Sequence, residues 1–226
     1  MANNKRNLKT AEPRQRFHSE EERIKHREGI ARRHHEEVFN STFHPRSLYT
    51  TFTLDDEHEV HTFEEAEHMA DLVMRRFKYN NPDAQIMFYM GRGKSTNRIH
   101  FHMVSNGLSE ELIRAKWKAG SVIRIEYLRE HNYYNGTDYG QDYSGLANYL
   151  FNHWTPEQGG HHYKATRNVQ QPDKRPPAVI KRTYSESKPP RAPKGYKLVE
   201  CKSNRYGYQY FKYVREIEEH SPHVKC

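Results

Sequence analysis

Cysteine is nearly absent from the sequence, which holds two in 226 residues. Both stand near the C-terminal end, at Cys201 and Cys226, and no Cys-x-x-Cys spacing occurs. These two residues cannot form a disulfide framework, and the composition fits a reducing, intracellular setting. We therefore expect a cytoplasmic protein.

Long apolar runs are missing as well. No stretch approaches the length that a membrane span requires, and residues 1–9 are polar, without the apolar core of a signal peptide. We therefore expect no membrane association. Hydrophobic residues make up only 34% of the chain. This fraction predicts one compact domain with polar, partly extended ends.

Basic residues are in excess, with 37 Lys and Arg against 29 Asp and Glu, for a net charge of +8. A positive balance of this size favours a polyanionic partner, most simply nucleic acid. The alternative is a basic protein that is merely soluble.

Hydrophobic periodicity predicts an α+β fold. Period-two patterns predict strands at residues 48–54, 85–90, 99–104 and 122–128, and helical spacing predicts helices between Thr62 and Asn80 and over 110–117 and 143–153. This order is that of the split βαβ, ferredoxin-like arrangement. It predicts one antiparallel sheet with helices on one face and with the other face free for a ligand.

The two ends differ in character from this domain, which we place at residues 46–165. Residues 1–45 form a charged segment, predicted to be a solvated helix to about residue 37 within an extended basic arm. Residues 166–226 form a proline-rich basic linker and an aromatic C-terminal segment. We predict one or two strands within 196–214 that pack back on the domain, and nucleobase stacking is the alternative use of their aromatic side chains.

Two histidines, His100 and His102, stand one residue apart within the apolar run Ile99–Val104. On a strand they emerge on the same face, and such a rigid pair suits a divalent metal ion. The alternative is two half-buried polar residues. With 16 histidines in the chain, roughly one such pair is expected by chance.

The predicted helix at 143–153 carries Tyr149 and His153, which share one helix face at a spacing of four. If that face looks onto the sheet, His153 supplies a third metal ligand and Tyr149 projects beside the metal. A phenol in that position can attack a phosphodiester and form a covalent phosphotyrosine. The alternative for Tyr149 is an amphipathic helical residue with a solvated hydroxyl.

At these residues the chain resembles the HUH endonuclease superfamily, and more closely the rolling-circle replication initiators of bacterial plasmids, phages and integrated elements. Residues 99–104 match the family's histidine motif, residues 145–150 resemble its tyrosine helix, and residues 48–54 stand where its first-strand motif does. Residues 164–168 resemble a block that follows the tyrosine helix in related initiators.

The resemblance implies metal-dependent nicking and joining of single-stranded or hairpin origin DNA in a bacterial cytoplasm. Tyr149 would form a 5′-phosphotyrosine intermediate, and the cofactor would be Mg²⁺ or Mn²⁺. The chain has no recognisable helicase module, so we expect a host or element helicase as a partner. We assign phosphate contacts to Arg98, Lys164 and Arg167.

The chain departs from the family pattern at the third ligand, because His153 stands where relatives often have glutamate. An imidazole there shifts the metal preference towards Mn²⁺ or another transition metal. Glu126 and Asp142 are the substitute ligands, and Tyr143 is the alternative nucleophile. Two rival functions stay open. One is a relaxase or single-strand transposase of the same superfamily, and the other is a non-catalytic nucleic-acid-binding domain.

Overall fold

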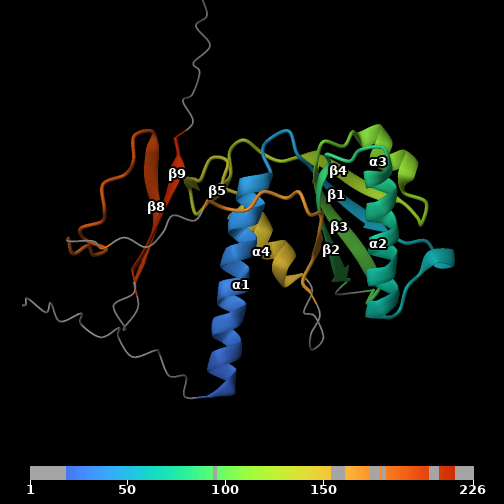
Figure 1. The fold of residues 1–226 in the computed structure, drawn as a ribbon, viewed down its shortest axis with the longest axis horizontal. Coiled ribbons are helices and arrows are strands. Elements are labelled where there is room, and N and C mark those ends of the chain that lie inside the picture. Colours follow the sequence, from blue (N-terminus) through green and yellow to red (C-terminus); the bar gives the residue numbers. More distant parts are fainter. Residues whose placement is uncertain are drawn as a thin grey trace, which may run out of the picture.

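The computed structural model describes residues 19–93, 96–153, 161–173, 179, 182–203 and 209–216. They form an α+β fold around a five-stranded antiparallel sheet of order β4-β1-β3-β2-β7 (Figure 1). The strands are β1 (Leu48–Thr53), β2 (Gln85–Arg92), β3 (Ile99–Asn106), β4 (Val122–Tyr127) and β7 (Lys164–Ala165). The four predicted strands are confirmed, and the histidine strand β3 is central as expected. The fifth strand, β7, is an addition at the sheet edge.

Helices α2 (Phe63–Tyr79) and α3 (Glu110–Lys116) cover one face of the sheet. Both begin where the sequence predicts. Thr62 and Glu65 form a reciprocal capping box at α2, and the Ser109 hydroxyl accepts from Leu112 N–H at α3. The core on this face contains buried aromatic and aliphatic side chains of strands and helices, among them Phe52, Phe77, Phe88, Phe101 and Ile113.

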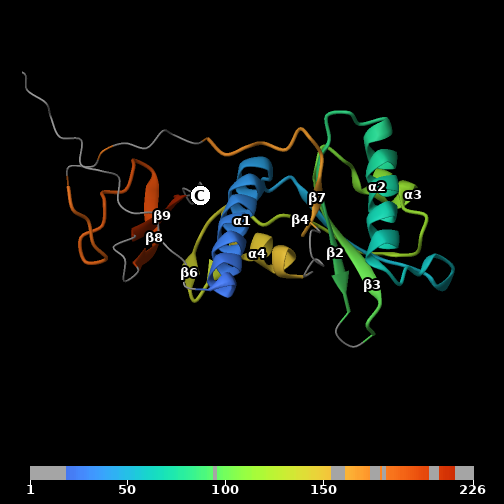
Figure 2. The same cartoon turned by 60° about the horizontal axis from the view of Figure 1, so that its bottom comes forward.

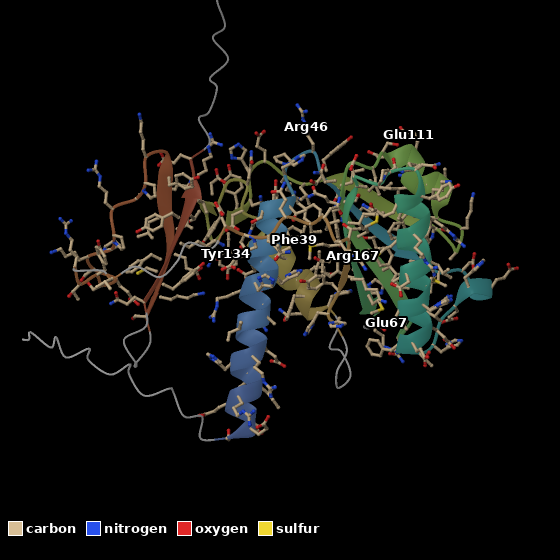
Figure 3. The ribbon with its side chains drawn as sticks, in the orientation of Figure 1. Phe39, Arg46, Glu67, Glu111, Tyr134 and Arg167 are labelled. Atoms are coloured by element: carbon tan, nitrogen blue, oxygen red, sulfur yellow. The ribbon has the colours of Figure 1, made fainter. Side chains whose placement is uncertain are left out.

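Helices α1 (Glu20–Thr42) and α4 (Ser144–Asn152) cover part of the other face (Figure 2). Phe39 of α1, labelled in Figure 3, belongs to a second core with Tyr89 and Val104 of the sheet and Leu150 of α4. The prediction of helices on one face only is therefore wrong. The physical reason is that Met87, Tyr89 and Val104 point to the second face and need apolar cover.

The helix predicted to about residue 37 is confirmed as part of α1, but the expectation that it lies in an extended, solvated arm is wrong for the part that the structure describes. Residues 1–18 lie outside that part. Helix α1 begins with solvated ion pairs, such as Arg23 with Glu20, but ends against the sheet. His35, Val38 and Phe39 are buried in its last turns. Three buried side chains at helical spacing are enough to dock a helix whose remainder is charged.

The C-terminal segment forms a separate hairpin of β8 (Tyr196–Ser203) and β9 (Gln209–Arg215), which confirms the predicted strands. Lys212 Nζ lies 2.5 Å from Asp142 Oδ2, just before α4, so the hairpin contacts the domain. A smaller hairpin of β5 (Tyr133–Tyr134) and β6 (Thr137–Asp138) precedes α4. Among the described residues, none of the helices combines the length and the apolar character needed to cross a bilayer.

Candidate metal centre

Three histidine side chains converge on the second face of the sheet. His100 and His102 project side by side from β3, and His153 stands at the C-cap of α4. One nitrogen from each ring lies within 4.8 Å of the others. The His100 and His153 Nε2 atoms are 2.7 Å apart, so one of them donates a hydrogen bond to the other. These three residues could hold a metal ion.

Local packing explains why His153 reaches the sheet. Ala147, Leu150 and Phe151 form the buried side of α4. Ala147 and Leu150 pack in the second core with side chains of α1 and the sheet, and this packing fixes the rotation of the helix. Tyr149 and His153, four residues apart, share the helix face that meets the histidine strand, with ring centroids 5.0 Å apart. The predicted helix thus brings both predicted residues to the same place.

Gly91 of β2 leaves the space that the histidines occupy. It stands opposite His100 in the β2–β3 register. A Cβ atom built on Gly91 would lie 2.0 Å from His153 Cδ2 and 2.9 Å from His100 Nε2. Neither distance is compatible with van der Waals contact, so the approach of the two rings requires glycine at this position.

The electrostatic setting favours neutral imidazoles, whose lone pairs are metal ligands. Burial, followed by the charges of His100 and His153, lowers the pKa of His102 to about 3. Burial also lowers the pKa of His100, against a smaller opposing effect of a backbone hydrogen bond with Arg98. His102 Nε2 is buried and has no hydrogen-bond partner among the described residues. A buried, unpartnered nitrogen beside two further imidazoles fits a cation of the N-preferring transition type.

The other ring nitrogen of His102 has two partners that the sequence reasoning missed. Tyr49 Oη lies 2.9 Å from His102 Nδ1, and Thr51 Oγ1 lies 3.2 Å from it. Both residues belong to β1, which the sequence identifies as a strand. Their alternation with Leu48, Thr50 and Phe52 signals that they point to the histidine face, but the contact itself depends on the strand register.

The two substitute ligands lie outside this group. Glu126 forms an ion pair with Arg124 on β4. Asp142 accepts hydrogen bonds at the start of α4, from Ser144 and Asn40, and pairs with Lys212. Within the described residues, the only group of three potential ligands is the histidine triad.

The two candidate tyrosines have opposite surroundings. Tyr143 is 2% exposed in the core beside Phe39, and burial raises the pKa of its phenol to about 12. Tyr149 is 51% exposed, with its ring centroid 6.2 Å from that of His102. The fold therefore brings Tyr149, and not Tyr143, to the open side of the triad.

The three predicted phosphate contacts lie in two places, Arg98 in one and Lys164 and Arg167 in the other. Arg98 pairs with Asp56 at 2.9 Å and with Glu59 at 3.1 Å, around the 3-10 turn Asp56–His58. Lys164 pairs with Asp71 of α2 at 2.8 Å. Lys164 and Arg167 line a groove of 940 Å³ between α2 and β7. Glu67 of α2 also lines this groove, and Figure 3 labels both Glu67 and Arg167. The structure does not bring these cations together around the triad.

Comparisons of the chain with protein-family models, with curated proteins and with solved structures gave no match. The class of protein is therefore defined by geometry: an α+β chain with an antiparallel sheet and a histidine triad that could hold a metal ion.

Proposed function

We propose that the chain is a DNA-nicking and DNA-joining enzyme of the HUH type, acting as a rolling-circle replication initiator. One observation carries the proposal: a half-exposed tyrosine, Tyr149, stands beside three convergent imidazoles that lie partly buried on a rigid strand and a helix end. A structural metal site needs no exposed phenol next to it, whereas phosphoryl transfer through tyrosine does.

The strand order adds support. Strands β4-β1-β3-β2, with α2 and α3 as the crossovers on one face, have the connectivity expected for the split βαβ, ferredoxin-like arrangement. In such a sheet the histidine strand is central and the second face can carry a site. Here α1 and α4 cover part of that face, and α4 delivers Tyr149 and His153 to the remainder.

In the proposed reaction, His100, His102 and His153 would hold Mn²⁺ or Mg²⁺, and three imidazoles favour Mn²⁺. When bound there, such an ion would supply Lewis-acid polarisation of a phosphodiester. The Tyr149 hydroxyl oxygen attacks phosphorus, its proton is released, and the bond from phosphorus to the 3′-oxygen breaks. The departing oxygen gains a proton and becomes a free 3′-hydroxyl, while the 5′ phosphate stays on Tyr149. A 3′-hydroxyl that attacks this ester reverses the step and joins strands.

The substrate we propose is single-stranded or hairpin origin DNA, which fits the net charge of +8, with a helicase as partner. Of the three predicted phosphate contacts, Arg167 alone forms no ion pair among the described residues, so it would have none to break on binding phosphate. Arg98 and Lys164 must exchange carboxylate partners for phosphate. A relaxase or single-strand transposase would use the same Tyr149 chemistry on different DNA.

The test is a covalent adduct on a denaturing protein gel. The protein is incubated with fluorescent single-stranded hairpins, with Mn²⁺ or with EDTA, alongside Tyr149→Phe and Tyr143→Phe. We expect a labelled band with Mn²⁺ in the wild type and in Tyr143→Phe, and none with EDTA or in Tyr149→Phe. Binding that weakens with salt but gives no adduct on any hairpin would favour a non-catalytic binding domain instead.

A further inference from the structure

The two ring nitrogens of His102 lie in different surroundings. Nδ1 is within hydrogen-bond distance of the Tyr49 and Thr51 hydroxyls. Nε2 is buried without a hydrogen-bond partner among the described residues, and His102 is one of the three residues of the triad. With Nδ1 beside the two hydroxyls, Nε2 is the nitrogen left for a metal ion. His102 itself is only 4% exposed, so water does not compensate freely for either nitrogen.

The sheet register builds this contact. Thr51 of β1 stands directly opposite His102 of β3, and Tyr49 lies two residues earlier on the same face. The Tyr49 ring stacks on the His102 ring, with centroids 5.6 Å apart and planes 17° apart. His102 is therefore held both by its ring face and by one ring nitrogen.

A neutral imidazole carries one proton, on either Nδ1 or Nε2. If Nε2 carries it, the lone pair that a metal needs is lost. If Nδ1 carries it, the proton can be donated to a hydroxyl oxygen of Tyr49 or Thr51, and the Nε2 lone pair points into the triad. A hydrogen bond to the outer nitrogen is the usual means of fixing the tautomer of a metal-binding histidine.

We infer that Tyr49 is a positioning residue of the proposed metal centre. Together with Thr51 it accepts the His102 Nδ1 proton and so presents the Nε2 lone pair to the metal ion. The inference rests on the proposed function only as far as the metal centre is concerned, and it is independent of DNA cleavage.

The first measurement is metal affinity. Co²⁺ is titrated calorimetrically into the wild type, Tyr49→Phe, and the double variant Tyr49→Phe/Thr51→Val, at one fixed pH. Phenylalanine keeps the ring stacking and removes only the hydroxyl. We expect the double variant to bind Co²⁺ at least about tenfold more weakly, with Tyr49→Phe intermediate because Thr51 still accepts. The matched control is Tyr127→Phe on the neighbouring strand β4, where the side chain is 60% exposed, with unchanged affinity.

The second measurement reads the tautomer directly by long-range ¹H–¹⁵N correlation of the histidine side chains in the metal-free protein. We expect the Nδ1–H pattern for His102 in the wild type and a shift towards Nε2–H in the double variant. A merely structural role of Tyr49 would not change this pattern.

The outcomes distinguish the positioning role of Tyr49 from the existence of the metal centre. A wild type that binds Co²⁺ but whose double variant binds it equally well, or a wild-type His102 protonated on Nε2, overturns the role of Tyr49 and leaves the metal centre standing. A wild type that binds no Co²⁺ overturns both. If the variants lose Co²⁺ affinity as expected but the wild type forms no DNA adduct, the role of Tyr49 stands and the proposed nicking function is wrong.

Discussion

Gly91 is the residue on which the closeness of the histidines depends. Replacing it by alanine adds a methyl group where His153 and His100 now lie, within 2.0 Å and 2.9 Å of their ring atoms. We expect Gly91→Ala to push the His153 ring away and to weaken Co²⁺ binding by at least about tenfold, a loss typical of a displaced or unsupported ligand. Isothermal titration calorimetry measures this loss.

Gly145 gives the matched control, because it is a second glycine close to the site in sequence. It lies in the first turn of α4, and a Cβ there meets nothing within 4 Å. Gly145→Ala should leave Co²⁺ affinity unchanged and stabilise the fold by about 0.5–1 kcal/mol, as alanine is the better helix residue. Equal Co²⁺ affinity in both variants would mean that His153 is not held against Gly91.

Some residues of the candidate site could be predicted from the sequence and others could not. His100, His102, Tyr149 and His153 follow from spacing along one strand and one helix, which local periodicity predicts. Tyr49 and Gly91 do not, because their roles depend on which strand lies opposite His102 and His100. That register is set by long-range pairing, which the sequence of one strand does not contain.

At the scale of elements, α1 is the part of the fold that was least predictable. Its charged first turns look solvated, and its docking depends on a short apolar end and on the buried His35. The sequence of residues 34–37, His-His-Glu-Glu, gives no indication that His35 is buried and neutral. Helices α2 and α3 combine clear caps with apolar periodicity, and strands β1 to β4 carry period-two patterns, so the sequence predicts these elements well.

The burial of His35 makes the docking of α1 sensitive to acid. Burial, followed by the charges of His162 and His34, lowers the pKa of His35 from 6.5 to about 3. The unfolded chain thus binds more protons than the folded chain between these values. The stabilisation is complete above the unfolded pKa and is lost as the pH falls towards the folded one. From pH 6.5 to pH 5 the loss is about 2 kcal/mol.

Urea unfolding of the wild type and His35→Gln at the two pH values measures this loss. Glutamine can still hydrogen-bond to Tyr89 Oη, which lies 2.8 Å from His35 Nε2, but does not titrate. We expect the wild type to lose about 2 kcal/mol more than the variant on acidification. The remaining histidines are common to both proteins, so the comparison isolates the contribution of His35. Parallel losses in the two proteins would contradict a neutral, buried His35.

For the whole molecule, a metal ion at the triad would connect the sheet to α4 and stabilise the folded chain. An ion at 100 times its dissociation constant adds about 2.7 kcal/mol. For a chain of this size the midpoint of thermal unfolding should rise by about 5–10 °C. We expect this rise with Mn²⁺ or Co²⁺, its reversal by EDTA, and its loss in His153→Ala.

His161→Ala is the control for this experiment, because His161 is an exposed histidine outside the triad. It should keep the full metal-induced rise. A rise of equal size in His153→Ala and the wild type would show that the ion binds elsewhere on the molecule.

The ion pair between Lys212 and Asp142 has a consequence for the order in which the protein is completed during synthesis. The ribosome releases the chain from its N-terminus, so all three histidines and Tyr149 emerge before Lys212 does. Until then, Asp142 at the start of α4 has Asn40 and Ser144 as partners but lacks its cation. The anchor of the tyrosine helix is therefore completed by a segment that is translated well after the helix itself. A product that ends soon after His153 would carry every proposed ligand and the nucleophile without this anchor.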